Sequence, residues 1–284
     1  MGQFHQFTVG NIQCTSLFDG ARQLEIAAVF DRTPADELYA AMDSLELPYQ
    51  FTGGMNLLYL ETGEHKILID TGLPAAQLAN SMAAAGINSA EISHILITHG
   101  DGDHIGGLAN FPDAQIILPQ ESWDLWTSEA GLAQMVEEWV MVLGKRGPAE
   151  TLPQRKAGRA RYGSEVLPSL GDRVTLVEPE VDVVPGIRFV TAPGHRSDHF
   201  AVEIVSEGAT LLHVVDAFRH PIQAARPEWV SFFDSFPEQT TVTANRLMAR
   251  AVEKDALIFC SHHAFPGLVR LSSAETTYTW TSLS

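Results

Sequence analysis

Hydrophobic and polar residues alternate along the first half of the 284-residue chain with two different periods. Apolar residues at every second position, or in short unbroken runs, predict strands, whereas apolar residues at every third or fourth position predict helices. Residues 33–46 show the helical period with Thr33 in the place of an N-terminal cap, and Asp19-Gly20 is typical of a turn. The predicted strands are 4–18 (one strand or two), 56–61, 66–70, 95–97 and 114–118, and a further helix is predicted over 74–86.

The second half continues with short β-like pieces that are separated by Gly, Asp and Pro. A helix is predicted over 241–254, because Leu247 and Met248 fall on its apolar side. The stretch 272–284 is rich in Ser and Thr, and its pattern leaves open whether it forms a final strand or a tail. The predicted strands of this half are 174–177, 181–184, 187–190, 200–205, 210–215 and 256–260.

The composition is that of a globular, acidic chain. Hydrophobic residues make up 45% and charged residues 19% of the sequence, which excludes a disordered protein. The 35 acidic residues outnumber the 18 basic ones and give a net charge of −17. A protein that binds nucleic acid needs a basic face to neutralise phosphates, so we expect no nucleic acid among the partners.

Two further features predict a cytoplasmic protein. No apolar run is long enough to cross a bilayer, and the N-terminus lacks a basic segment followed by an apolar stretch, so neither a membrane partner nor a secretory signal is expected. Cys14 and Cys260 stand in apolar surroundings and are expected to be buried thiols rather than a disulfide.

Residues that carry chemistry are concentrated in the stretch 92–108. An apolar run ending at Ile97 predicts a buried strand, and the loop after it holds four potential metal ligands between glycines. Gly100 and Gly102 let the backbone fold tightly, so that alternate side chains can converge on one point. Imidazole and carboxylate groups together suit zinc, iron or manganese. The four residues are His99, Asp101, Asp103 and His104.

This loop resembles the His-x-His-x-Asp-His signature of the metallo-β-lactamase-fold hydrolases, with Asp101 where the family usually has its second histidine. Four further motifs are similar to those of the family and follow in the same order, so the resemblance extends over residues 56–270. The two later histidine motifs look most like those of methyl-parathion-hydrolase-like and lactonase-like enzymes. The four motifs are Asp70-Thr71-Gly72, Ala192-Pro193-Gly194-His195, Val215-Asp216 and Ser261-His262-His263-Ala264-Phe265-Pro266-Gly267.

The resemblance implies one α/β domain over residues 1–284, a four-layer αββα sandwich that holds two divalent transition-metal ions. These ions would be zinc, iron or manganese. The two ions would share a bridging hydroxide and lower its pKa towards neutrality. Asp103 is the expected catalytic residue, which orients the hydroxide or passes its proton to the leaving group. The implied ligands are His99, Asp101 and His195 for the first ion, Asp103, His104 and His262 for the second, and Asp216 as the bridge.

Asp101 changes the charge of the predicted site. An aspartate brings a full negative charge and a harder oxygen ligand than the neutral imidazole that it replaces. Together with Asp103 and Asp216 it should favour iron or manganese over zinc. We expect it to bind the first ion directly or through a water molecule, because that ion would otherwise have too few protein ligands.

Several polar residues beside these motifs are expected to support the site rather than to form it. Asp70 should brace the ligand loop, and His199 should hydrogen-bond a ligand or the backbone. His263 should face away from the ions, and His220 should line the pocket. Arg196 has two interpretations, a contact with a substrate anion or, as the favoured one, a surface salt bridge.

Residues 121–165 join the two halves through apolar residues at helical spacing, followed by a basic segment. In the family that the chain resembles, such an insertion tends to lie over the metal site. Two interpretations have equal weight: a lid whose tryptophans set specificity, or a solvated helical surface whose tryptophans pack into the core. The tryptophans are Trp123, Trp126 and Trp139, and the basic residues are Lys145, Arg146, Arg155, Lys156, Arg159 and Arg161.

The favoured function is a dinuclear metallohydrolase that acts on a small-molecule ester, lactone or phosphotriester. The alternative is a di-iron oxidoreductase, because flavodiiron proteins share this fold and carry a carboxylate at the position of Asp101. The end of the chain soon after the last ligand argues against the flavodoxin-like domain of those proteins. A binding module that has lost its metal is disfavoured by the nearly complete ligand set. Assembly into a homodimer is left open.

Overall fold

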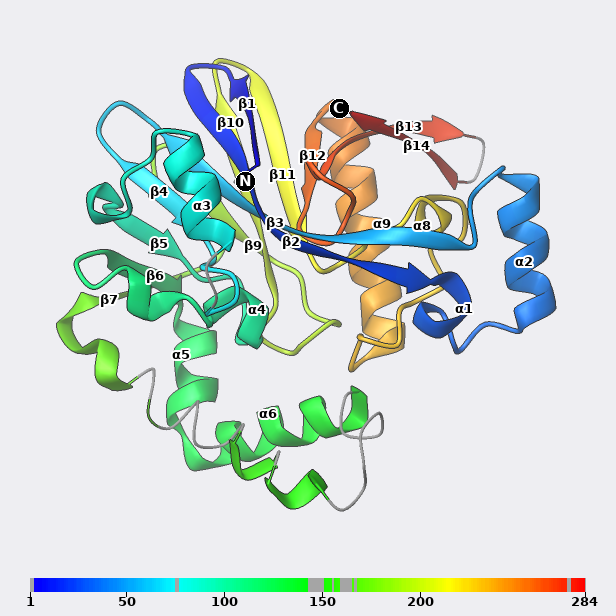
Figure 1. Ribbon diagram of the computed structural model, residues 1–284, viewed down its shortest axis with the longest axis horizontal. Coiled ribbons are helices and arrows are strands. Elements are labelled where there is room, and N and C mark those ends of the chain that lie inside the picture. Colours follow the sequence, from blue (N-terminus) through cyan, green and yellow to red (C-terminus); the bar gives the residue numbers. More distant parts are fainter. Residues whose placement is uncertain are drawn as a thin grey trace.

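The part of the chain that the structure, a computed structural model, describes contains two sheets of seven strands each, with helices packed around them (Figure 1). In both sheets, every strand pairs with strands that neighbour it in the sequence. Within the described residues, no helix is long and apolar enough to span a membrane. The described residues are 3–74, 77–142, 151–154, 156–158, 165, 168–274 and 277–283.

The first sheet is antiparallel from β1 to β4 and parallel from β4 to β7. Because β4 and β5 are parallel neighbours, the loops that follow them lie at the same edge of the sheet. The strands are β1 (Phe4–Val9), β2 (Ile12–Glu25), β3 (Gln50–Glu61), β4 (Lys66–Ile69), β5 (His94–Leu96), β6 (Gln115–Pro119) and β7 (Val174–Val177).

The second sheet is antiparallel except for β11 and β12, which are parallel and are connected through the long helix α9 (Pro237–Glu253). The stretch 272–284, for which the sequence left a strand or a tail open, contributes to a hairpin of β13 and β14. The strands are β8 (Asp182–Val184), β9 (Ile187–Thr191), β10 (Phe200–Ser206), β11 (Ala209–Val215), β12 (Leu257–Cys260), β13 (Leu268–Ala274) and β14 (Thr277–Leu283).

Apolar side chains between the two sheets form the central core. Leu58 and Ile69 of the first sheet pack in one buried cluster with Phe189 and Val202 of the second. The outer face of the first sheet packs against α3 (Gln77–Ala84) and α5 (Gln120–Thr127), and the outer face of the second sheet packs against α9. This arrangement confirms the predicted αββα sandwich. Further helices are α1 (Ile26–Val29), α2 (Ala35–Ser44), α4 (Gly102–Ile105), α6 (Glu129–Val142) and α8 (Ile222–Ala225). The 3-10 turns are η1 (Ser89–Glu91), η2 (Leu108–Asn110) and η5 (Pro168–Arg173).

Three local predictions are wrong. Asp19-Gly20 is not a turn, because β2 continues through it with a shift of register against β3. The Asp19 carboxylate instead accepts the backbone N–H groups of Leu73 and Leu78, a long-range contact that overrides the turn propensity. Thr33 does not cap α2, whose N-cap is Pro34. The strand β7 belongs to the first sheet, so the second half begins after it.

The predicted insertion forms α5 and α6, which hang below the first sheet in Figure 1. Of its basic segment, Lys156 is described, and its ammonium lies 3.0 Å from the carboxylate of Glu137. The predictions for Lys145, Arg146, Arg155, Arg159 and Arg161 lie outside the described residues.

Candidate metal centre

Four loops bring the predicted ligands to one edge of the sandwich. His99 and His104 follow β5, and the three other ligand loops follow β9, β11 and β12. These three strands run in the same direction, so their carboxyl ends share an edge. The N–H of Phe200 donates to the carbonyl of Thr98 at 3.0 Å and joins the loops of the two sheets.

The ligand atoms form two groups with Asp216 between them. His99, His195 and Asp216 make the first group, and Asp103, His104 and His262 make the second; within each group, one ligand atom per residue lies within 4.8 Å of the others. Asp216 Oδ2 lies 3.3 Å from His195 Nε2. Its Oδ1 lies 3.3 Å from His104 Nε2 and 3.1 Å from His262 Nε2. Asp216 therefore has the position of a bridge.

All four histidines of these groups are anchored through the ring nitrogen that faces away from the centre. Nδ1 of His104 lies 2.7 Å from Asp70 Oδ2, and Nδ1 of His195 lies 3.0 Å from Asp234 Oδ1. The corresponding partners are Thr98 Oγ1 for His99 at 3.1 Å and the carbonyl of Gly54 for His262 at 3.0 Å. A partner on Nδ1 leaves Nε2 free to face the centre and fixes the orientation of the ring.

Three atoms at the middle of the centre are buried without a hydrogen-bond partner among the described residues: His99 Nε2, His104 Nε2 and Asp216 Oδ1. A buried polar atom without a partner is costly, and native structures contain few of them. His99 and Asp216 belong to the first group and His104 to the second, so a pair of cations would give these buried atoms partners, and the donor set fits such a pair.

The electrostatics of these ligands agree with that fit. Burial, with a smaller effect of His104, holds the pKa of His99 well below its usual value, so its imidazole is neutral and can accept a cation. Burial by itself would raise the pKa of Asp216, but His262, His195 and His104 hold it well below the usual value. The Asp216 carboxylate is therefore ionised.

Asp101 lies beside the first group but is held by Arg196. Its Oδ2 lies 3.5 Å from His195 Nε2 and 3.9 Å from His99 Nε2. Arg196 donates from Nη2 to that oxygen at 2.6 Å and from Nε to Oδ1 at 3.2 Å. Because Arg196 is only 3% exposed, the predicted surface salt bridge is wrong: the pair is buried.

Asp70 braces the ligand loop as predicted. Its carboxylate accepts the backbone N–H and the hydroxyl of Thr98 at 2.9 and 2.7 Å, in addition to its contact with His104. The residue itself has a φ of 61°, in the left-handed region. The same loop needs a glycine at Gly107, where a Cβ would lie 2.2 Å from the carbonyl oxygen of Thr71.

The neighbouring histidines take supporting positions. His199 contacts the carbonyl of Ala192 through Nδ1 at 2.7 Å and accepts the N–H of Asp216 at 3.2 Å, as predicted. His263 faces away from the centre, with its ring against Trp280. His220 is buried and packs against the ring of Phe51, with centroids 4.5 Å apart, rather than lining an open pocket.

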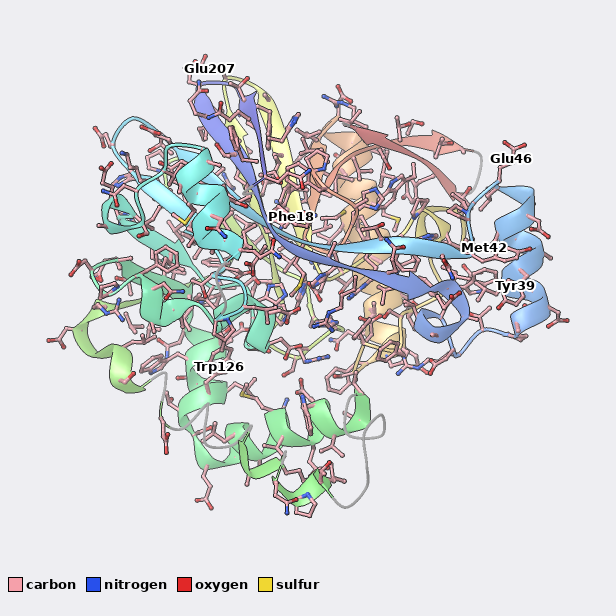
Figure 2. All side chains as sticks on the ribbon, viewed as in Figure 1. Phe18, Tyr39, Met42, Glu46, Trp126 and Glu207 are labelled. Atoms are coloured by element: carbon pink, nitrogen blue, oxygen red, sulfur yellow. The ribbon has the colours of Figure 1, made fainter. Side chains whose placement is uncertain are left out.

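The insertion is docked on the ligand loops. Trp126, labelled on α5 in Figure 2, is fully buried, and its indole N–H donates to Asp198 at 2.5 Å. The ring lies against Gly100, where a Cβ would come within 2.1 Å of it. On α6, the carboxylate of Glu138 accepts the N–H of Ser197 at 3.1 Å. Trp126 therefore packs into the core, while Trp123 and Trp139 are half-buried.

Sequence reasoning missed two charged residues at the centre. Asp234 holds His195, but it follows a short irregular stretch that has no motif. Arg219 lies with Nη2 3.3 Å from Asp216 Oδ2 and with its guanidinium 4.9 Å from the ring centre of Phe233. Its position three residues after the predicted bridge was the available signal.

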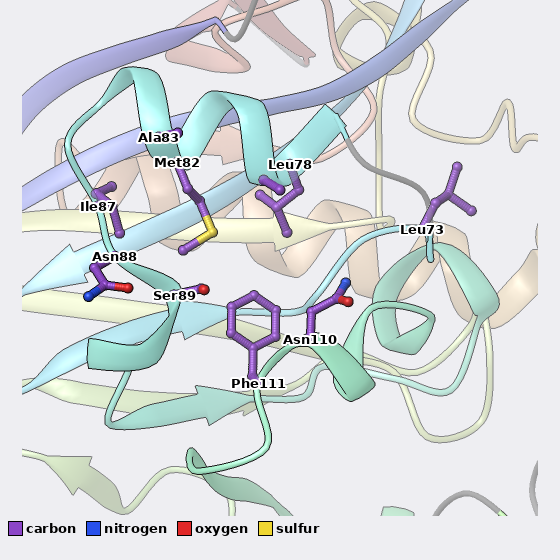
Figure 3. Close-up of a pocket in the computed structure, with 10 residues that line it drawn as sticks. Leu73, Leu78, Met82, Ala83, Ile87, Asn88, Ser89, Asn110 and Phe111 are labelled. Carbon is purple, nitrogen blue, oxygen red and sulfur yellow. The ribbon is translucent and has the colours of Figure 1, made fainter.

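The cavities differ in chemistry. A space of about 10 Å³ beside the second group is lined by Asp103, His104 and His262, together with Met55. The groove in Figure 3 is much larger, about 440 Å³, and lies between α3 and the 3-10 turns η1 and η2. Its lining is apolar or amide and hydroxyl in character, without a titratable side chain, so it offers no metal ligands.

The comparisons with known proteins agree with this geometry. The sequence model of a family described as "Metallo-beta-lactamase superfamily" matches residues 52–262. The chain is 26% identical over 194 residues to "Probable metallo-hydrolase Rv2300c" of Mycobacterium tuberculosis, which covers 58% of this chain and 57% of that protein. The match thus spans little more than half of that relative. The chain is also 38% identical over 103 residues to "Atrochrysone carboxyl ACP thioesterase" of Aspergillus fumigatus. This match covers 35% of this chain and 24% of that protein.

Two solved structures share the whole architecture. One is AidC, described as a dizinc quorum-quenching lactonase, with a TM-score of 0.86 and 22% identity over 100% of this chain and 98% of that one. The other is the hydrolase AbOPH, with a TM-score of 0.83 and 21% identity over the same shares. At these identities the similarity shows the fold.

Proposed function

The chain belongs to the metallo-beta-lactamase superfamily of metal-dependent hydrolases, and we propose that it hydrolyses a small lactone, ester or phosphotriester at a centre of two metal ions. The observation that carries this proposal is Asp216, whose two carboxylate oxygens face two separate groups of ligands. The relatives named above are hydrolases, a thioesterase and a lactonase, which favours hydrolysis over the di-iron oxidoreductase alternative.

The first ion would be held by His99 and His195, and the second by Asp103, His104 and His262, with Asp216 shared. Asp101 Oδ2 lies 3.9 Å from His99 Nε2 and 3.5 Å from His195 Nε2, and we propose it as a further ligand of that ion. Zinc is the first metal to test, because AidC is a dizinc enzyme.

Two bound divalent ions would supply a water of lowered pKa and Lewis acids for the carbonyl or phosphoryl oxygen of the substrate. The chain's own residues handle the proton. The side chain of Asp103 is 33% exposed, and its Oδ2 lies 3.6 Å from His262 Nε2, so it borders both the centre and the solvent. From there its carboxylate can take a proton from the attacking water and hand it to the leaving oxygen.

Partners and location follow as further parts of the proposal. We infer a small-molecule substrate, a cytoplasmic location and no nucleic-acid partner. Cys14 and Cys260 support the location, because both are buried free thiols.

A metal analysis combined with a substrate panel tests the proposal. The purified chain should hold close to two transition-metal ions, and it should hydrolyse a member of a panel of lactones, aryl esters and phosphotriesters. A chelator should remove ions and activity together. A chain that binds no transition metal, or that keeps its activity after complete metal removal, would contradict the proposal.

A further inference from the structure

Arg196 and Asp101 form a built ion pair at the edge of the first ligand group, where the chain departs from its family's signature. We propose that Arg196 is a positioning residue that compensates the charge of Asp101 and thereby limits the affinity of the first site for its metal ion. This inference rests on the proposed dinuclear centre. In this inference the Arg196–Asp101 pair, and not Asp101 alone, takes the role of the second histidine in the family's signature.

The pair has the geometry of a fixed fork. Arg196 contacts both carboxylate oxygens of Asp101, through Nε at 3.2 Å and Nη2 at 2.6 Å. Such a two-point contact holds the carboxylate in one orientation and is stronger than a single ion contact. Asp101 Oδ2, which accepts the shorter bond, is also the oxygen that faces His195 and His99. An ion at the first site would therefore share this oxygen with a cation.

The guanidinium cannot leave this position for a substrate. Its Nη1 donates to the carbonyls of His195 at 2.6 Å and Phe233 at 2.8 Å, and to the hydroxyl of Ser235 at 3.1 Å. All three nitrogens of the group thus have partners, and the side chain is buried. The contact with a substrate anion that the sequence allowed does not fit this environment.

Counting both charges changes the expected metal chemistry. Asp101 alone would add one negative charge to the first group, but the pair adds none. An anionic carboxylate attracts a divalent ion more strongly than a compensated one does, and the difference is large where water is excluded. The first site should therefore bind its ion less tightly than its carboxylate count suggests, and closer to an all-histidine arrangement.

A purely structural role for Arg196 predicts the opposite result. In that case the residue only ties the loop of His195 to Asp101 and Ser235. Its loss would loosen His195 and weaken metal binding. The sign of the change in affinity therefore separates the two roles.

The test uses the variants Arg196→Met and Arg196→Lys, with the stepwise dissociation constants for Zn²⁺ measured by competition with a chromophoric chelator. Arg196→Met should lower one of the two constants by roughly tenfold, because Asp101 then faces the ion uncompensated. It should also lower the melting temperature of the metal-free chain and enlarge the rise in melting temperature on adding Zn²⁺. Arg196→Lys keeps the charge but not the two-point contact, so its constants should lie between those of the wild type and those of Arg196→Met.

Arg250→Met is the matched control. Arg250 holds the buried Glu203 with two contacts of 2.8 Å, on the α9 side of the second sheet and among residues that are no metal ligands. Its loss should lower the melting temperature without changing either constant. If Arg196→Met leaves both constants unchanged or raises one, the proposal is wrong.

Asp101→Asn covers the case in which Arg196→Met does not fold. It keeps the shape of the side chain but leaves Arg196 as an uncompensated cation, so one constant should rise by roughly tenfold. Unchanged constants would overturn the inference. A different result would contradict the proposed function: a wild-type chain that does not bind two metal ions.

Discussion

The two ligand groups of the centre differ in how the protein covers them. In the first group, His99 is fully buried and His195 is 3% exposed, beneath the docked insertion. In the second group, the side chains of Asp103 and His262 are 33% and 14% exposed. The first site is therefore enclosed by protein, whereas the second faces the solvent, and substrate should approach from the second side.

The cause of the difference is what packs outside each group. The loop that carries His195 contacts α5 through Asp198 and Trp126, and α6 through Glu138. The loop that carries His262 is held from one side by Asn56, whose Nδ2 donates to the carbonyl of His263 at 2.7 Å. The insertion thus encloses the first ligand group. Four predictions test how the insertion, the ligands and Asp216 each affect metal binding, activity and stability.

The largest effect is expected where the two groups meet. Asp216→Ala should remove most of both ions and lower kcat/KM by more than about a hundredfold, because even the outer partner of a metal ligand contributes about 10–100-fold. Elemental analysis and kinetics on one preparation measure both. Loss of a single ion would show that Asp216 serves one group and is not shared.

The second prediction separates adjacent histidines of the exposed group. His262→Ala should weaken the binding of one ion by at least about tenfold, since it removes a ligand rather than an outer partner. His263→Ala is the control and should leave both dissociation constants as in the wild type, because its ring packs on Trp280. The reverse result would mean that the ligand loop is shifted by one residue.

The third prediction compares the outer carboxylates. Asp234→Asn and Asp70→Asn keep the shape of the side chains that anchor His195 and His104, and each should weaken metal binding by about 10–100-fold. The two variants should affect different ions, which chelator titration of each variant and of the double variant can resolve. Additive effects are expected for separate sites, and a strong non-additive term would mean that the groups act as one.

The smallest effect should come from the insertion. Trp126→Phe keeps a ring near Gly100 but removes the donor to Asp198, so we expect a loss of about 1–3 kcal/mol in the free energy of unfolding. KM should change little, because Trp126 is not exposed to a substrate. Trp123→Phe is the control and should cost less in chemical denaturation. A change in substrate preference for Trp126→Phe would instead favour the lid interpretation.

The sequence was sufficient to predict the position of a residue when that position depends on its own strand and loop. Each ligand motif stands at the end of an apolar run, so the site could be placed at the ends of strands. It was insufficient where a partner comes from far along the chain. Arg196 and Asp101 are 95 positions apart, and His195 and Asp234 are 39 apart, so no local pattern announces either contact. The turn expected at Asp19 failed for the same reason, because its partners lie beyond residue 70.

The order of strands in the two sheets has a kinetic consequence. Hairpin pairs such as β1–β2 and β10–β11 close short loops, which favours rapid folding, whereas the parallel pairs β6–β7 and β11–β12 are joined by long connections that contain helices. Because every pair still lies within one half of the chain, each half can form its own sheet first. Contacts such as the one between His262 and Gly54 join the halves and must form on docking. Ions whose ligands come from both halves would stabilise the docked state but not the separate sheets. We therefore expect bound metal to slow the unfolding of the protein far more than it speeds refolding.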